Sequence, residues 1–381
     1  EERGLGSSDD LDDLPPEERR TALAQMLLED SVCKAWAANG IPVNRLGSFA
    51  VAAAVLDQIH MLEELDTTTL RDKYTEFGLP QGDALLHDEL MSRLSQVVVW
   101  DAMPLEEMRY ECSKQGCELP PNPGDEDGER RELLDRILLA TYAESFEARG
   151  VPARRLGSFQ SAASLAEQLD ALPGLGGVEE LRKHSEDYGL PQGGRLDRPE
   201  LLQRLREFLV WVALPVEELR AECKALALPQ PLPEEATDEQ GQVEERRKLL
   251  DQILLQRYAA VFEEGQVPAS RLCSFQAAYG IAKLFATLED TGAEDLLDQY
   301  LQYGLPVERP IDKHELLKRL REYVVVNELP LAQLRRERGL PAGGEQLSTE
   351  EEEAARAELL DTVLMEQYAD AFETNGFPPS R

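Results

Sequence analysis

The sequence predicts an all-α protein, a tandem array of about nine helix–loop–helix units of about 38 residues each. Two observations lead to this prediction. Apolar residues recur every three or four positions, and proline-containing landmarks that end helices recur at a nearly constant spacing. A third observation, a longer period of about 110 residues, groups the units in threes. We expect either a solenoid-like stack or separate beads of three units.

The segment around residue 140 gives the clearest predicted helix. Its apolar residues follow a spacing of three or four, at Leu134, Ile137, Leu138, Tyr142 and Phe146. That spacing places them on one face of a helix. Gly150 suits the position just past a helix end, and Pro152 cannot continue the helix. The pattern therefore predicts a helix that buries one face and stops at Gly150.

Similar landmarks, an apolar residue followed by proline, divide the whole chain, at Pro42, Pro80, Pro120, Pro152, Pro191, Pro229, Pro268, Pro306, Pro341 and Pro378. After each Gly-Leu-Pro landmark of the middle type, a Glu-Leu pair begins 9 residues later, at Glu89, Glu200 and Glu315. Such a fixed register predicts that each landmark separates the two helices of a pair.

A longer motif repeats as well. Residues 45–49 read Arg-Leu-Gly-Ser-Phe, and the motif returns at residues 155–159 and, with Cys in place of Gly, at residues 271–275. The offsets between these copies are 110 and 116 residues. Another copy starts at Gly376 and reaches Arg381. We therefore expect this chain to be a segment of a longer repetitive polypeptide.

The repeat predicts the domain organisation. Residues 1–20 are expected to form an acidic linker, and residues 21–132, 133–248 and 249–358 to form repeats 1, 2 and 3. Residues 359–381 are expected to begin a truncated repeat 4.

The charge balance restricts the partners. The chain has 40 Lys and Arg against 74 Asp and Glu, a formal net charge of −34. Binding to nucleic acid or to an anionic membrane needs clustered basic residues, so this charge argues against both. No apolar run approaches the ~20 residues of a membrane-spanning helix, and we expect no membrane insertion. A basic protein, or a subunit of a larger assembly, would suit the charge as a partner.

The 5 cysteines are odd in number and dispersed along the chain. This pattern indicates free thiols rather than a disulfide framework. It favours a reducing intracellular compartment, either the cytoplasm or the interior of an organelle.

Two stretches, residues 105–138 and 216–254, share a pattern. Each begins Leu/Val-Glu-Glu-Met/Leu-Arg and later reads Glu-Arg-Arg-x-Leu-Leu-Asp, and residues 178–208 match more loosely. These stretches resemble the SAP-type helix–extended–helix module, in which two helices are joined by an extended loop containing Gly-Leu. The resemblance implies that fold, and it implies DNA binding by basic residues around the loop and the second helix. Arg130-Arg131 and Arg246-Arg247 are present there, although the loops themselves are acidic.

The repeated Arg and Phe of the long motif are the candidate functional residues, at Arg45, Phe49, Arg155, Phe159, Arg271 and Phe275. One hypothesis is a repeated interaction face. The alternative is structural: the Arg pairs with a carboxylate of a helix, the Ser between them caps the next helix, and the Phe fills the core.

We identify no catalytic, cofactor-binding or metal-binding residues in the sequence. The four histidines have no Cys or His at a ligand spacing, and the glycine-rich stretches lack the Gly-Lys-Ser/Thr of a phosphate loop. We therefore expect a non-enzymatic scaffold that contacts several proteins along its length. The alternative is a SAP-like protein associated with nucleic acid, and an enzyme is the third hypothesis.

Overall fold

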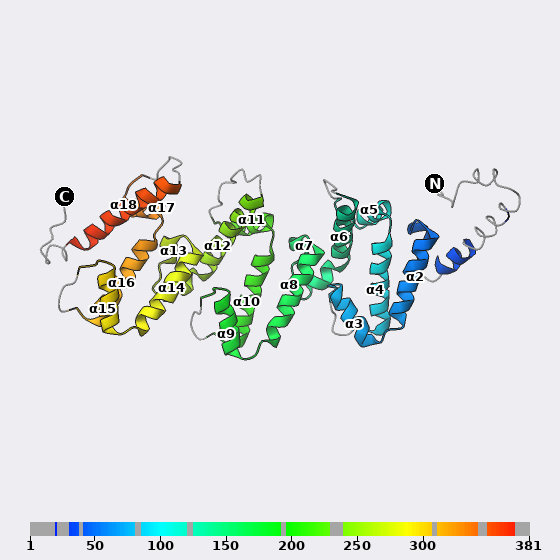
Figure 1. Ribbon diagram of the computed structural model, residues 1–381, viewed down its shortest axis with the longest axis horizontal. Helices are drawn as coiled ribbons and strands as arrows, with labels where there is room; N and C mark the ends of the chain where they lie inside the picture. Colours follow the sequence, from blue (N-terminus) through cyan, green and yellow to red (C-terminus); the bar gives the residue numbers. More distant parts are fainter. Residues whose placement is uncertain are drawn as a thin grey trace. The chain divides into compact units, whose positions relative to one another are not determined.

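The structure is a computed structural model of the chain (Figure 1). It describes residue 20 and residues 30–37, 41–80, 85–119, 125–191, 196–228, 239–306, 311–341 and 349–369. The expected acidic linker, apart from Arg20, and the motif from Gly376 to Arg381 lie outside these residues. The chain divides into two compact units, Glu1–Asp170 and Ala171–Arg381, and each is described by itself.

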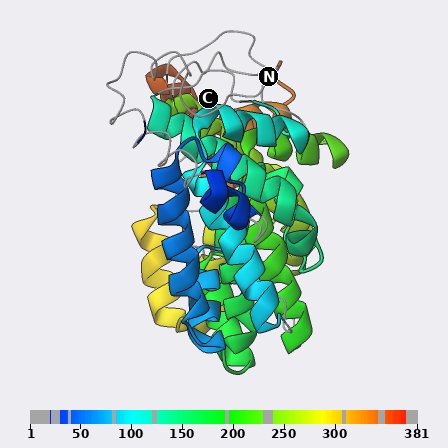
Figure 2. The same cartoon turned by 90° about the vertical axis from the view of Figure 1, so that its right-hand side faces the viewer.

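All the elements of the described residues are helical, which confirms the predicted all-α fold class. The first unit contains η2 (Val43–Arg45), α2 (Phe49–Glu63), α3 (Thr67–Glu76), α4 (His87–Ala102), α5 (Leu105–Lys114), α6 (Glu126–Glu147), α7 (Ala153–Leu156) and α8 (Phe159–Ala171), the last ending at the unit boundary. Within this unit α2 and α4 lie side by side in both views (Figure 1 and Figure 2).

The second unit repeats the same order of elements. It contains η3 (Leu172–Gly174), α9 (Val178–Asp187), α10 (Arg198–Ala213), α11 (Val216–Ala225), α12 (Glu239–Glu264), α13 (Ala269–Leu272), α14 (Phe275–Asp290), α15 (Ala293–Gln302), α16 (Lys313–Glu328), α17 (Leu331–Glu337) and α18 (Thr349–Gln367). The helices at equivalent places keep their lengths: α3, α9 and α15 have 10 residues, and α4, α10 and α16 have 16.

The proline landmarks end helices as the sequence predicts. After Gly78 and Gly150, whose φ angles are +68° and +83°, the next residue's N–H bonds a carbonyl five residues earlier, in the Schellman arrangement. The same bond recurs throughout the two units, from Ile41 to Trp36, Leu79 to Tyr74, Cys117 to Cys112, Val151 to Phe146, Leu190 to Ser185, Leu228 to Cys223, Val267 to Phe262, Leu305 to Tyr300 and Leu340 to Arg335. Each bond satisfies a carbonyl that the end of the helix leaves unpaired.

At most of the described landmarks, the apolar residue belongs to the core. Leu79, Val151 and Leu190 are 3%, 1% and 2% exposed. These landmarks stop a helix and bury a side chain, whereas Leu119 and Leu340, at two other landmarks, are 47% and 44% exposed.

The predicted apolar face of α6 is buried, with one adjustment. Ile137, Leu138, Tyr142 and Phe146 are 0–7% exposed. Leu133 is 0% exposed, whereas Leu134 is only half-buried. The buried stripe therefore begins one residue earlier than the sequence predicts.

The fixed register between landmark and Glu-Leu is explained by helix capping. Glu200 is the third residue of α10; its N–H donates to Asp197, and its carboxylate accepts from the Asp197 N–H at 3.1 Å. Glu89 accepts in the same way from the N–H of Leu86, at 3.2 Å. Glu89 and Glu200 thus each satisfy an N–H group at the beginning of their helix, whereas the carboxylate of Glu315 accepts from Arg319.

The repeat has a period but no unique starting point. The three boundaries chosen from the sequence, after residues 132, 248 and 358, fall within α6, α12 and α18. α6 and α12 each pack against a helix before them and a helix after them, so neighbouring repeats share a helix. The count of nine units and their grouping in threes remain predictions.

Candidate functional site

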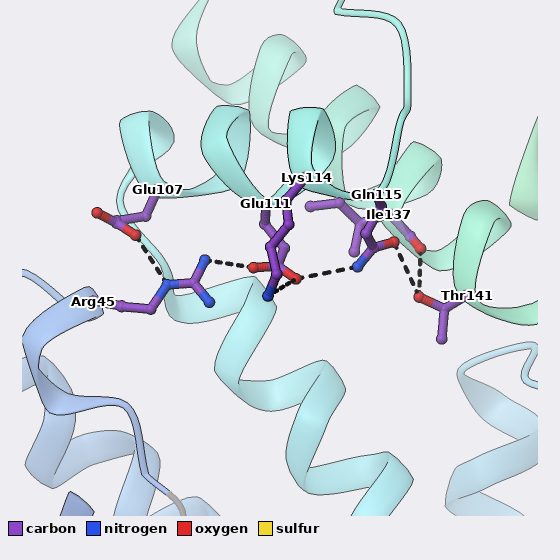
Figure 3. Close-up of polar contacts among 7 residues, drawn as sticks. All are labelled: Arg45, Glu107, Glu111, Lys114, Gln115, Ile137 and Thr141. Atoms are coloured by element: carbon purple, nitrogen blue, oxygen red, sulfur yellow. Dashed lines mark hydrogen bonds and ion pairs between the residues drawn. The ribbon is translucent and has the colours of Figure 1, made fainter.

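The first candidate residue, Arg45, connects η2 to α5 (Figure 3). Its Nε donates to the Glu107 carboxylate at 3.0 Å, and its Nη2 lies 2.7 Å from Oε2 of Glu111. The side chain of Glu111 is only 8% exposed. Burial opposes the ionisation of Glu111, but the hydrogen bonds from Arg45 and Gln115 and the charge of Arg45 outweigh it and hold the pKa of Glu111 below its ordinary value.

The network continues from α5 into α6. Gln115 donates to Glu111 at 3.3 Å, and Thr141 donates both to Gln115 at 3.3 Å and to the carbonyl of Ile137 (Figure 3). Lys114 adds a weaker ion pair with Glu111, at 3.7 Å. This network of side chains therefore links η2, α5 and α6.

Arg271 makes the equivalent contact in the second unit. Its Nε and Nη2 donate to the two oxygens of Glu337, at 2.7 and 2.9 Å. The hydrogen bond from Arg271 lowers the pKa of the Glu337 carboxyl. Arg155 has the same position in α7 and is half-buried.

The serine of the motif caps the next helix, together with an aspartate from the preceding long helix. Ser158 and the N–H groups of Phe159 and Gln160 all donate to Asp135 of α6, at 3.0–3.2 Å. Asp251 of α12 receives the same three bonds from residues 274–276, at 3.0–3.3 Å. The Leu-Leu-Asp repeat was visible in the sequence, but the capping role of its Asp was not.

The phenylalanines are packing residues. Phe159 and Phe275 are 6% and 4% exposed, and Phe49 is half-buried. Phe159 meets Phe146 edge-on with ring centroids 5.7 Å apart, and Phe275 meets Phe262 in the same way at 5.6 Å. Phe159 and Phe275 are therefore packing residues, and the repeated interaction face remains a hypothesis.

A second recurring ion pair joins the helices on either side of the acidic loops. Arg109 of α5 donates two hydrogen bonds to Glu129 of α6, at 2.6 and 2.8 Å. Arg220 of α11 does the same to Glu245 of α12, with both bonds at 2.7 Å. Hydrogen bonding from Arg109 lowers the pKa of Glu129. This planar, two-bond geometry fixes one helix against the other.

The first arginine of each Arg-Arg pair also has a structural contact. Arg130 donates to the carbonyl of Asp101 at 2.7 Å, near the end of α4. Arg246 donates to the carbonyls of Val212 and Leu214, and Arg356 to those of Asn327 and Leu329. A guanidinium at this place satisfies helix-end carbonyls and suits the negative end of the helix dipole.

The thiols of Cys112 and Cys223 are 0% exposed. Burial, followed by the proximity of Cys117, raises the pKa of Cys112 to about 12, and burial raises that of Cys223. Both are therefore protonated at neutral pH and unreactive as nucleophiles.

Within the described ranges, no group of three or more His, Cys, Asp or Glu side chains could hold a metal ion. No helix in those ranges combines the length and the apolar character that crossing a bilayer requires.

The second unit contains a groove of about 910 Å³ whose walls come from α13, α14, α16, α17 and α18. Phe285, Val325 and Val363 supply part of its apolar surface, and the Arg271–Glu337 pair lies at its edge. Val326 also lines it, at the repeat position where Trp100 and Trp211 stand. A smaller residue therefore occurs where two other copies carry an indole.

These contacts give the repeated polar residues structural roles. Comparisons with protein-family models, curated proteins and solved structures found no match.

One recurring feature remains exposed. An aromatic residue precedes each Gly-Leu-Pro landmark of the middle type and is partly open to solvent: Phe77, Tyr188 and Tyr303 are 47%, 39% and 45% exposed. These aromatics lie next to the Gly-Leu-Pro landmarks in the sequence. Their recurrence as aromatics was visible in the sequence, but their exposure was not.

Proposed function

We propose that this protein is a non-enzymatic scaffold whose acidic helical repeats make multivalent contacts with other proteins. The observation that supports this proposal is the exposed aromatic at the same turn of each repeat, Phe77, Tyr188 and Tyr303. Aromatic rings are enriched at protein interfaces because they bury a large area at little conformational cost. Three copies on one polypeptide would bind a multivalent partner more tightly than one copy.

Acidic residues precede two of these aromatics and indicate the kind of partner. Glu76 precedes Phe77, and Glu186 and Asp187 precede Tyr188. With a net charge of −34, the whole chain would attract basic protein surfaces and accelerate their association. The proposed partners are therefore basic proteins or basic subunits of a larger assembly.

Nucleic-acid association is the alternative class, and the arginine contacts do not favour it. Arg130 and Arg246 bond helix-end carbonyls, and Arg247 pairs with Glu244. An arginine used in this way would have to break its contacts to reach a phosphate.

The first experiment is purification of the native protein from its source at moderate salt, followed by mass identification of whatever co-purifies. A protein that co-purifies in stoichiometric amount is then produced separately, and its affinity for this chain is measured by biolayer interferometry. Single, double and triple substitutions at the exposed aromatics, F77A, Y188A and Y303A, should reduce that affinity in graded steps.

The matched controls are M61A and L86A. Met61 and Leu86 are exposed apolar residues, 61% and 71% open to solvent, and at neither position do all three copies of the repeat carry an apolar residue. The controls should bind as the unchanged protein does. Equal affinity of the triple variant and the controls would contradict the proposal. Nuclease-sensitive nucleic acid in place of a protein partner would support the alternative.

A further inference from the structure

In each unit, a helix from the next repeat covers the second half of a long helix. These contacts show what kind of helix packs there. In the first unit, α8 covers α6: Asp135 accepts from Ser158 and from the N–H groups of Phe159 and Gln160. In the second unit, α14 covers α12 by the same bonds to Asp251. Both covering helices begin with Ser-Phe.

The covering helix also contacts the turn at the preceding Gly-Leu-Pro. A Cβ atom at Gly78 would lie 2.8 Å from Cβ of Ala163 in α8, so α8 packs directly on that turn. A Cβ atom at Gly189 would lie 3.7 Å from Cε1 of Tyr279 in α14. The Tyr279 hydroxyl donates to the carbonyl of Glu186 at 3.3 Å, next to the same turn.

The third long helix, α18, carries the same receiving residues with nothing on them in the described part of the chain. Asp361 is the repeat equivalent of Asp135 and Asp251, and it is exposed whereas both of those are half-buried. Leu364 is half-buried, although its equivalents Leu138 and Leu254 are 7% and 5% exposed. A Cβ atom at Gly304 would meet no atom within 4 Å.

We propose that this end surface, formed by Asp361 and Leu364 of α18 and by the turn at Gly304, binds an amphipathic helix that begins with Ser-Phe. The inference goes beyond the scaffold function, because it names the ligand of one surface on α18. This surface adjoins Tyr303 at the turn, but Phe77 and Tyr188 take no part in it.

The chemistry of the two occupied copies explains the choice of ligand. The first N–H groups of a helix have no partner within the helix, and they carry the positive end of its dipole. A carboxylate fixed opposite them accepts charge-assisted hydrogen bonds. Asp361 supplies that carboxylate. The serine hydroxyl of the bound helix is a third donor beside the two N–H groups, and the phenylalanine ring packs against the apolar side of α18.

The test uses the full chain and a synthetic peptide of residues 265–290, which contains α13 and the Ser-Phe helix α14. Binding is measured by isothermal titration calorimetry, and sedimentation velocity at the same protein concentrations shows whether the chain self-associates. We expect saturable one-to-one binding. The substitution D361N should weaken it about tenfold or more, since bonds to a charged group are lost.

The matched control is E358Q, one turn earlier on the exposed side of α18, which should leave the affinity unchanged. Peptides with Ser274→Ala or Phe275→Ala should bind less tightly to the unchanged chain, and the Ser274→Ala penalty should disappear when the chain carries D361N. That coupling is specific to a contact between these two residues.

Three outcomes would overturn the proposal. They are the absence of binding at millimolar peptide, equal affinity of the D361N variant and the unchanged chain, and peptide binding that is indifferent to both peptide substitutions. Self-association that survives D361N would likewise place the contact elsewhere.

Discussion

At the scale of single residues, the contact of Arg45 with Glu111 should make stability depend on pH in a defined direction. The Glu111 pKa is lower in the folded protein than its ordinary value of 4.5. The stabilisation is therefore complete above about pH 4.5 and is lost as the pH falls through the lowered folded-state pKa. We expect Arg45→Gln to cost about 1–3 kcal/mol at pH 7, because it leaves a buried carboxylate without its charged donor.

Thermal unfolding of both proteins between pH 3 and pH 7 tests this expectation. The difference in Tm should shrink as the pH falls, because Glu111 becomes protonated in both proteins. The control is Lys34→Gln, which removes an exposed ion pair with Asp30 and should change Tm very little. A Tm difference for Arg45→Gln that stays constant across the pH range would show that the contact has no electrostatic role.

The contacts of single residues are the part of the structure that the sequence predicts least. The spacing of Arg45, Ser48 and Phe49 predicted that they act together, but spacing could not decide between a surface and a core. That decision depends on partners distant in sequence, such as Glu111, which lies 66 positions after Arg45. A repeat reveals which positions are constrained without revealing what constrains them.

At the scale of elements, the helix ends give the most direct prediction. Among the residues that the structure describes, three that are not glycine have positive φ angles: Ala227 at 53°, Gln266 at 62° and Cys273 at 56°. The equivalent positions in other copies hold Gly116, Gly150 and Gly157. A side chain in this left-handed conformation is strained, so replacing each of the three by glycine should stabilise its unit by about 0.5–1 kcal/mol.

Urea unfolding of the variants A227G, Q266G and C273G measures this gain. The reciprocal change Gly150→Gln should destabilise the first unit by about 1 kcal/mol. The control is Gly280→Ala in the middle of α14, where a Cβ atom meets nothing within 4 Å and helix propensity favours alanine. Stabilisation by G280A together with destabilisation by Q266G would show that the left-handed conformation is not what limits stability.

The caps of the covering helices give a second prediction at this scale. Asp251→Ala should cost about 1–2 kcal/mol, because the first N–H groups of α14 lose their acceptor. Asp361→Ala, at the equivalent but exposed position, should leave the unfolding free energy of the chain unchanged. Urea unfolding followed by circular dichroism measures both. Equal costs would mean that Asp361 already has such a role within the chain.

Most of the helices could be predicted from the sequence, because their ends are encoded locally by a Gly, an apolar residue and a Pro. The start of the buried stripe on α6 was misplaced by one residue, at Leu134 instead of Leu133, since two adjacent leucines fit the helical period almost equally. The shorter third copy, α17, ends at Glu337 after 7 residues where α5 and α11 have 10. Landmark spacing alone does not define where within an interval a helix ends.

At the scale of the whole molecule, the charge of −34 was the clearest sequence-level property, and it predicts how salt should act. Repulsion among excess carboxylates destabilises the compact state, and salt screens it. The opposing effect is the screening of ion pairs. The pairs that join helices, such as Arg109–Glu129, have one nearly buried partner and are screened less.

Repulsion should therefore dominate, and Tm should rise by about 3–5 °C between 10 mM and 200 mM NaCl at pH 7. Choline chloride at the same ionic strength separates screening from binding of a cation. An equal rise with both salts means that stability is limited by self-repulsion, so a basic partner would stabilise the fold simply by neutralising it. A fall in Tm would mean instead that the exposed ion pairs dominate, and the acidic surface would then have to be explained by the partner alone.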